Sequence, residues 1–154
     1  MIFRAFEAAD GEARGRRLAA VARRRGLVLL AGADAGLASR IRAAGVHLPE
    51  RAARRAGALR RAHPRWLATA AAHDARAIRR ARLAGVDAVL VSPVFASASP
   101  SAGRPLGVVR FAALVRGAGL PVYALGGVNA RTARRLLESG AIGVAAVEAL
   151  ALRT

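Results

Sequence analysis

The chain has 154 residues, which is enough for one domain with a substantial core. It contains no cysteine, which excludes disulfides, cysteine-based zinc sites and thiol catalysis. The formal charge is +17 and all 26 basic residues are arginine, but no aromatic interleaving or RNA-binding signature accompanies them, so no specific nucleic-acid partner is expected.

Short apolar runs alternate with Arg- and Ala-rich helical stretches over the whole chain, which predicts a single α/β domain with a parallel sheet. Seven strands are predicted, at Ile2–Phe6, Leu27–Ala31, Gly45–Leu48, Trp66–Ala71, Ala88–Val94, Val122–Leu125 and Gly143–Val147. Helices are predicted at Glu12–Arg25, Ala35–Ala44, Arg51–Ala62, Asp74–Ala84, Val108–Ala118 and Ala130–Ser139. The pattern fits either an open doubly wound sheet or a barrel.

Helix ends are marked by residues with specific backbone roles. Asp74 and Asn129 are predicted N-caps. Four glycines stand where a C-terminal glycine ends a helix: Gly26, Gly85, Gly119 and Gly140.

No apolar run is long enough to cross a membrane, and the N-terminus lacks the pattern of a secretory signal. A cytoplasmic protein without a membrane partner is therefore expected.

Small polar residues and glycines follow two late strands, where parallel folds bind ligands. Gly126 and Gly127 lie between a strand and a helix, and their N–H groups favour an anion, so phosphate binding is preferred over a plain tight turn. Ser97, Ser99 and Ser101 could donate hydrogen bonds to phosphate oxygens, or could simply form a polar turn.

The charged candidates lie at other strand ends. His73 ends a strand before a capped helix and is a candidate binding residue, whereas His47 lies inside an apolar strand and is interpreted as a core residue. Arg4 could bind phosphate bidentately if its side chain points inward. Asp34 and Glu50 could together hold one Mg²⁺ with a substrate phosphate, or could be two surface acids.

Six motifs in register resemble the thiamine phosphate synthase/TenI family. They are Gly45-Val-His-Leu48, Thr69-Ala-Ala-Ala-His73, Ser92-Pro-Val-Phe95, Leu106-Gly107, Ala124-Leu-Gly-Gly-Val128 and Gly143-Val-Ala-Ala-Val147. The resemblance implies a TIM-type (β/α)8 barrel. It also implies transferase chemistry in which hydroxymethylpyrimidine diphosphate and thiazole phosphate give thiamine phosphate and pyrophosphate, with Mg²⁺ as cofactor. The family's TenI branch includes thiazole tautomerases.

The resemblance assigns roles to particular positions. Arg4, Asp34 and His73 are the candidate catalytic residues, and Asp34 and Glu50 are the candidate metal ligands. The candidate phosphate-binding residues are Ser97, Ser99, Gly107, Gly126, Gly127 and Val147.

The chain also departs from the family pattern. Gly32-Ala33 stands at the family's Asn-Asp pair, Ala52 at its second metal carboxylate, Pro100 at a lysine, and Pro93 at the histidine implicated in tautomerases. The alternative function is therefore a non-catalytic or TenI-like phosphate-ligand-binding barrel that has lost its metal site.

The family's first strand and helix have no counterpart in the chain. Seven strands would leave Ile2–Phe6 and Gly143–Val147 as free edges, so either an open barrel wall or a homodimer is expected.

Overall fold

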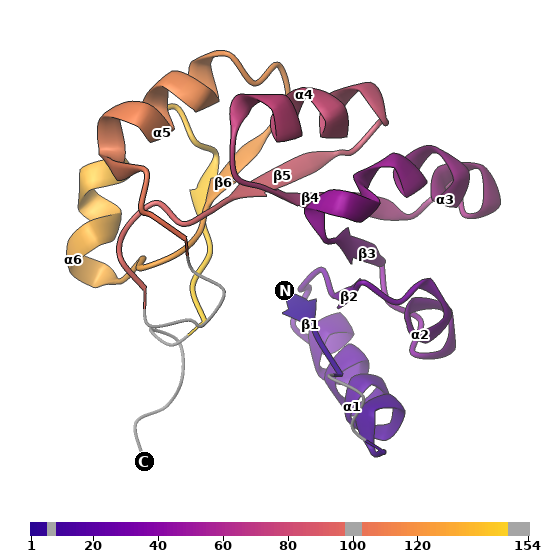
Figure 1. The fold of residues 1–154 in the computed structure, drawn as a ribbon. Helices are drawn as coiled ribbons and strands as arrows, with labels where there is room; N and C mark the ends of the chain where they lie inside the picture. Colours follow the sequence, from indigo (N-terminus) through magenta and orange to yellow (C-terminus); the bar gives the residue numbers. More distant parts are fainter. Residues whose placement is uncertain (6–8, 98–102, 148–154) are drawn as a thin grey trace.

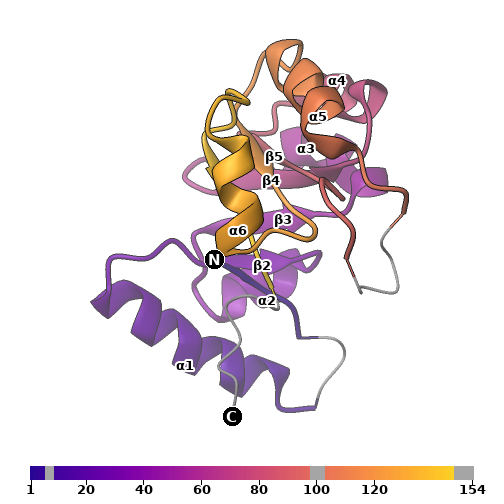
Figure 2. The ribbon, with the colours of Figure 1, turned by 90° about the vertical axis from the view of Figure 1, so that its left-hand side faces the viewer.

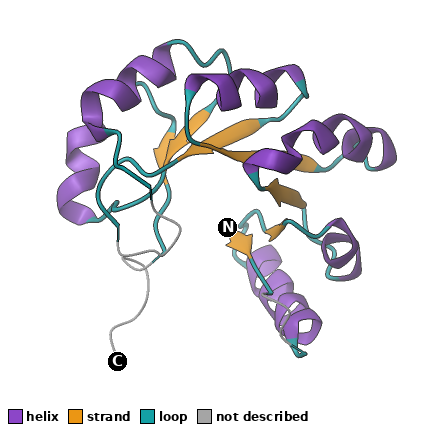
Figure 3. Cartoon of the chain, in the orientation of Figure 1, coloured by secondary structure: helices purple, strands orange, loops and turns teal. Residues whose placement is uncertain are grey.

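The structure is a computed structural model that describes residues 1–5, 9–97 and 103–147. Strands and helices alternate along the chain (Figure 3). The strands are β1 (Ile2–Phe3), β2 (Leu30–Gly32), β3 (Gly45–Leu48), β4 (Leu67–Ala72), β5 (Ala88–Val91), β6 (Val122–Ala124) and β7 (Gly143–Val144). The α-helices are α1 (Gly11–Arg24), α2 (Ala35–Arg40), α3 (Ala56–Ala62), α4 (Ala75–Leu83), α5 (Gly107–Arg116) and α6 (Ala130–Ala133). Two 3-10 helices adjoin them: η1 (Glu50–Arg55) precedes α3, and η2 (Arg134–Leu136) extends α6.

The strands form one seven-stranded sheet in which every neighbouring pair is parallel and the spatial order is the sequence order, β1 to β7. The sheet curls, and the helices lie outside it (Figure 1). A side view shows α4 and α5 next to each other over the middle of the sheet (Figure 2). In a doubly wound sheet, the order of the strands reverses at a point within the sheet instead of following the sequence. The sequential order therefore confirms the TIM-type barrel class.

The curled sheet is not closed by the strands that the structure describes. β1 pairs with β2, and β7 pairs with β6, but no hydrogen-bonded ladder joins β1 to β7 in that part of the chain. The two predicted end strands are therefore edge strands.

Several element boundaries differ from prediction for local reasons. β1 ends at Phe3, so its predicted end at Phe6 is wrong, although Phe6 itself lies outside the described residues. β2 begins at Leu30, because Leu27 still belongs to the turn after α1, where its N–H donates to the Ala22 carbonyl. β5 ends at Val91, and the Pro93 that follows has no N–H for a ladder bond.

The other differences are shortenings of helices and of the last strand. α2 ends at Arg40 rather than Ala44, since Arg42 takes a left-handed conformation with φ 55°. β7 covers two residues and stops before Val147. The helix predicted at Arg51–Ala62 is 3-10 in its first half, and the last predicted helix becomes 3-10 after Ala133.

The predicted helix caps are present. The Asp74 carboxylate accepts a hydrogen bond from the Ala77 N–H at 2.6 Å, and the Asn129 side chain accepts from the N–H groups of Arg131 and Thr132. The four predicted terminal glycines, Gly26, Gly85, Gly119 and Gly140, all have φ between 62° and 80°. Because these signals fix where each helix starts and stops, they also fix where the strand-end loops begin.

The core is built from small aliphatic side chains, as the low aromatic content predicts. Val46 on β3 and Val89 and Val91 on β5 are fully buried, together with many alanines. Phe111 on α5 is the largest fully buried side chain in the described part of the chain. Small side chains let the helices approach the sheet closely.

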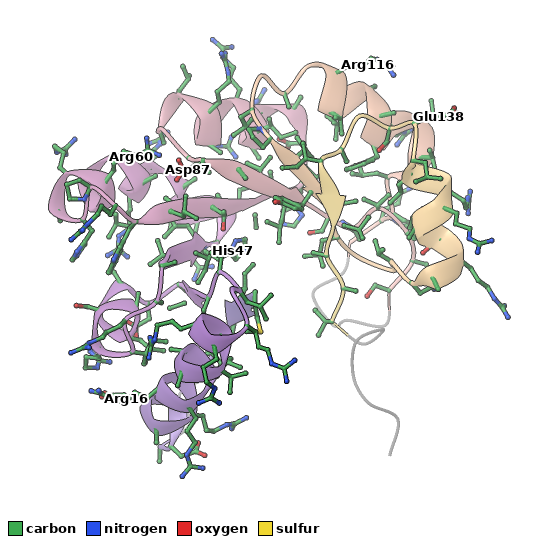
Figure 4. The ribbon with its side chains drawn as sticks, turned by 180° about the vertical axis from the view of Figure 1, so that it is seen from behind. Arg16, His47, Arg60, Asp87, Arg116 and Glu138 are labelled. Atoms are coloured by element: carbon green, nitrogen blue, oxygen red, sulfur yellow. The ribbon has the colours of Figure 1, made fainter. Side chains whose placement is uncertain are left out.

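The arginines lie mainly on the outer helices. In Figure 4, Arg16 on α1 and Arg116 on α5 extend away from the sheet, while Arg60 and Asp87 approach each other at the amino end of β5. The other Asp87 oxygen accepts a hydrogen bond from the Ala68 N–H at 2.7 Å, so this ion pair ties α3 to the sheet. None of the described helices is long and apolar enough to span a bilayer.

Candidate active site

Most of the predicted site residues follow the carboxyl ends of strands. Since all the strands are parallel, these positions share one edge of the sheet. In strand order they are Arg4, Asp34, Glu50, His73, Ser97, the pair Gly126 and Gly127, and Val147. Ser99 and Ser101 follow Ser97 in the sequence but lie outside the described residues. The topology thus places the candidates on a single rim, and their roles remain predictions.

The glycine pair after β6 has a backbone that only glycine accommodates. Gly126 has φ 90° and Gly127 has φ 62°. A Cβ on Gly126 would lie 2.7 Å from the Pro93 Cα, and one on Gly127 would lie 2.8 Å from the Phe95 Cβ. The Phe95 N–H donates to the Gly126 carbonyl at 3.0 Å. The pair is therefore clamped against the loop that follows β5.

The donors at this corner come from the glycines rather than from the helix. The Asn129 side chain takes the N–H groups of Arg131 and Thr132, and the Thr132 hydroxyl accepts from the Asn129 N–H at 2.9 Å. This capping box uses the first free donors of α6. Within the described residues, the N–H groups of Gly126 and Gly127 donate to no protein acceptor. These two N–H groups are what the corner offers to an anion.

Three other predicted phosphate contacts are placed less favourably. Gly107 has φ 73° and begins α5, but its N–H donates to the Val94 carbonyl at 2.9 Å. That N–H is therefore used within the fold. Val147 is exposed beyond the end of β7. Ser97 is partly buried and already has an interaction within the protein.

Arg4 and His47 occupy the corner formed by β1, β2 and β3. The Arg4 side chain crosses Gly32 so closely that a Cβ on Gly32 would lie 2.6 Å from the Arg4 Cγ. Burial, with a smaller contribution from the positive charge of Arg4, lowers the pKa of His47 to about 4. The His47 Nδ1 lies 2.9 Å from the Thr69 hydroxyl, so His47 has a partner inside the protein, as a core histidine should. A hollow of about 500 Å³ lies beside Arg4, Gly32 and Asp34.

Asp34 has a structural role in the same corner. Its Oδ1 accepts a hydrogen bond from the Leu37 N–H at 2.8 Å and so caps α2. The preceding residue, Ala33, has φ 64°, an uncommon backbone for a residue with a Cβ. Such strain tends to occur at functional sites. No sequence signal predicts it.

The two predicted metal ligands each have a partner within the protein, and their role in binding Mg²⁺ stays a prediction. Glu50 accepts a hydrogen bond from Arg80 at 2.6 Å, and its other oxygen lies 4.0 Å from the His73 Nε2, while Asp34 caps α2. In the part of the chain that the structure describes, no three carboxylate or histidine groups are placed to hold a cation together. Mg²⁺ uses few protein carboxylates, but those need oxygens directed at the ion.

His73 is held from both sides of its ring. Its Nδ1 lies 2.5 Å from the Ser92 carbonyl oxygen, and its Nε2 faces Glu50. Sequence reasoning missed Arg80 and Ser92 as members of this cluster. Arg80 lies in an arginine-rich helix in which no local signal singles it out, and Ser92 contributes a backbone carbonyl, which every residue has.

Comparison with known proteins places the chain in a family. The family model for thiamine monophosphate synthase matches residues 2–150. A putative thiamine-phosphate synthase 2 of Aquifex aeolicus is 29% identical over 72% of this chain and 59% of its own length. A thiamine-phosphate synthase of Geobacillus kaustophilus is 30% identical over 96% of this chain and 67% of its own.

A solved structure has the same fold. The thiamine phosphate pyrophosphorylase of Pyrococcus furiosus superposes with a TM-score of 0.80 at 22% identity, over 95% of this chain and 70% of that one. The chain spans about 59% of the Aquifex relative's length and somewhat more of the other two proteins. From the family match over nearly all of its length, the chain belongs to the thiamine monophosphate synthase family.

Proposed function

We propose that the protein is a thiamine-phosphate-synthase-type transferase that binds a phosphorylated heterocycle on the rim formed by the strand ends. The family match over residues 2–150 supports the reaction class. The observation that carries the site assignment is the Gly126–Gly127 pair, whose N–H groups donate to no protein acceptor among the described residues. The substrates proposed are those implied by the resemblance, hydroxymethylpyrimidine diphosphate and thiazole phosphate.

The glycine corner suits the phosphate of the thiazole substrate. Backbone N–H groups bind a phosphate oxygen without bringing a competing charge, and the tight contact with Phe95 holds them in place. Ser97 and the backbone near Val147 are the proposed neighbouring contacts, and Ser99 belongs to the same proposal although it lies outside the described residues. The Gly107 N–H would become available only if its bond to Val94 opened.

The diphosphate end of the other substrate is assigned to the corner near Arg4. As the methylene carbon of the pyrimidine bonds to the thiazole nitrogen, the carbon–oxygen bond to diphosphate breaks and pyrophosphate leaves. The aliphatic stem of Arg4 packs against Gly32, and a guanidinium carried on it can stabilise the charge that develops on the leaving oxygen. Because no base is needed for this exchange, a rim with few titratable groups can perform it. A Mg²⁺ requirement stays a prediction, and no step is assigned to the ion.

A second candidate function is a phosphate-ligand-binding barrel without catalysis. The observation that favours it is the position of Glu50, whose carboxylate is engaged by Arg80 rather than open to a cation. Ala33 and Ala52 add no carboxylate at the positions that the resemblance assigns to metal ligands. The two functions share the glycine corner and differ only in turnover.

Calorimetry with thiazole phosphate tests the shared part of the proposal. Saturable binding with one site per chain is expected, and Gly127→Asp should abolish it because a carboxylate would stand beside the N–H groups. Gly103→Asp is the matched control, since no described atom lies within 4 Å of a Cβ on Gly103 and its φ is not positive. Equal affinity in a folded Gly127→Asp protein, or no binding to the unmodified chain, would refute the assignment.

A further inference from the structure

The turn from β6 to α6 is held against the loop that follows β5 by two of its carbonyl groups. The Leu125 carbonyl accepts a hydrogen bond from the Val94 N–H at 2.9 Å, and the Gly126 carbonyl accepts one from the Phe95 N–H at 3.0 Å. In a trans peptide the N–H points opposite to the C=O. The N–H groups of Gly126 and Gly127, which share these two peptide planes, are therefore directed away from the β5 loop.

The next peptide group of the turn is fixed by a side chain instead. The Gly127 carbonyl accepts a hydrogen bond from the Thr132 hydroxyl at 3.0 Å. A hydroxyl has one proton to donate, and the alternative acceptor, the Asn129 carbonyl, is farther away at 3.4 Å. The same peptide geometry directs the Val128 N–H away from Thr132, which lies on α6.

The Val128 N–H is a third donor of this turn. Within the part of the chain that the structure describes, it donates to no protein acceptor, although Val128 is only 6% exposed. Buried N–H groups are nearly always paired, so a donor left over beside a proposed ligand site points to that ligand. Consecutive Cα atoms are about 3.8 Å apart, so the several oxygens of one phosphate can reach the N–H groups of Gly126, Gly127 and Val128 together.

Both anchors of this turn are themselves held in place. The Phe95 ring faces the Arg135 guanidinium, whose central carbon lies 5.2 Å from the ring centroid, and Arg135 belongs to η2. The Thr132 hydroxyl oxygen accepts from the Asn129 N–H at 2.9 Å, which leaves its own proton for the Gly127 carbonyl. The turn is therefore held by the β5 loop on one side and by α6 and η2 on the other.

We infer that Thr132 is a positioning residue for phosphate binding. Its hydroxyl fixes the Gly127 peptide group, so that the Val128 N–H becomes a third donor beside those of Gly126 and Gly127. The inference rests on the proposed function for the presence of a phosphate at this corner, and it adds one donor and the side chain that orients it. If Thr132 served only as part of the α6 capping box, its hydroxyl would stabilise the helix start and leave phosphate affinity unchanged.

The test is a two-dimensional ¹H–¹⁵N NMR titration with thiazole phosphate at pH 8, where a phosphate monoester carries close to two negative charges. The matched probe is the thiazole alcohol that lacks the phosphate. Thiazole phosphate should shift the amide protons of Gly126, Gly127 and Val128 downfield, with one shared dissociation constant. The alcohol should leave all three in place.

Three variants separate orientation of the peptide from capping of the helix. Thr132→Val removes the hydroxyl at nearly constant shape, so it should weaken binding by about fivefold or more and abolish the Val128 shift. Thr132→Ser keeps a hydroxyl and should restore the affinity of the unmodified chain. Asn129→Ala is the matched control, because it removes the other half of the capping box and leaves the bond between Thr132 and Gly127 intact. It should lower stability without weakening binding.

Two results would overturn the inference while the glycine corner stands. They are phosphate-dependent shifts at Gly126 and Gly127 without one at Val128, and equal losses of affinity in Thr132→Val and Asn129→Ala, which would show that Thr132 acts through α6. No shift at any of the three amides would refute the phosphate corner and the inference together. All three shifts without pyrophosphate release would refute only the transferase proposal.

Discussion

His47 on β3 and Thr69 on β4 are register partners in the sheet, and the His47 Nδ1 lies 2.9 Å from the Thr69 hydroxyl oxygen. Burial lowers the pKa of His47 to about 4, with a smaller contribution from Arg4. The unfolded chain would protonate this ring near pH 6.5, so between pH 6.5 and 4 the unfolded state binds more protons than the folded state. The stabilisation is complete above pH 6.5 and is lost as the pH falls toward 4.

We therefore expect the free energy of unfolding to fall by on the order of 3 kcal/mol from this group between pH 7 and pH 4. Urea unfolding at several pH values measures it. His47→Gln should flatten the dependence, because an amide can still hydrogen-bond Thr69 but does not titrate. Arg4→Gln should flatten it slightly, since the nearby positive charge is removed. An unchanged slope in His47→Gln would contradict the assignment.

Three glycine-to-alanine variants separate backbone strain from steric contact. The Gly103→Ala position has neither a positive φ nor a close neighbour among the described residues, so this variant should change the free energy of unfolding by less than about 0.5 kcal/mol. Gly85→Ala has φ 76° but open space, and should cost about 1 kcal/mol. Gly127→Ala has both a positive φ and backbone contacts with the β5 loop, so it should be the most destabilising of the three. Thermal melts give the order, and a Gly127→Ala protein as stable as Gly85→Ala would show that the loop moves freely.

Asp34 can be tested for two roles with two substitutions. Asp34→Ala removes the α2 cap and should cost about 1 kcal/mol of stability, whereas Asp34→Asn keeps a capping oxygen and should cost much less. If the charge also matters for turnover, both variants should lose at least tenfold in activity, equivalent to about 1.4 kcal/mol in the barrier. Full activity in a stable Asp34→Asn protein would limit this residue to its structural role.

The edge strands predict self-association. Val144 on β7 is 48% exposed at the edge of the sheet, where an unpaired apolar strand favours contact with a second copy. Light scattering of the unmodified chain should show a concentration-dependent mass, and Val144→Lys should reduce it. Val109→Lys is the control, because Val109 is 82% exposed on helix α5 rather than on an edge strand. A monodisperse monomer at high concentration would contradict the prediction.

The sequence predicts the framework of this protein well, because its signals are local. Asp74 caps a helix through its own carboxylate, and Gly85 ends that helix with a positive φ; both are visible from residue type and position. Strand–helix alternation alone fits either a doubly wound sheet or a barrel. The strand order could therefore be predicted only once the resemblance favoured a barrel. The Glu50–Arg80 pair joins residues thirty positions apart, and many arginines could have supplied the cation. Long-range pairing of this kind depends on packing, which residue patterns do not encode.

In the proposed site, too, the local features could be predicted from the sequence and the long-range ones could not. Gly126 and Gly127 could be found because a strand, two glycines and a helix form a recognisable sequence. Their proposed role as anion donors depends on a further fact, that the Asn129 side chain accepts from the first N–H groups of α6. Likewise, the sequence suggests that Gly107 contacts an anion, but in the fold its N–H donates a hydrogen bond to the Val94 carbonyl.

Pyrophosphate release is the measurement that tests the central proposal most directly. The 154-residue chain is incubated with hydroxymethylpyrimidine diphosphate, thiazole phosphate and Mg²⁺, and pyrophosphate and thiamine phosphate are quantified together. Both products should form in equal amounts, omission of either substrate should stop the reaction, and Gly127→Asp should abolish it. Thiazole phosphate binding without any release of pyrophosphate, at protein concentrations well above those needed for a slow enzyme, would contradict the transferase proposal and leave the non-catalytic binder.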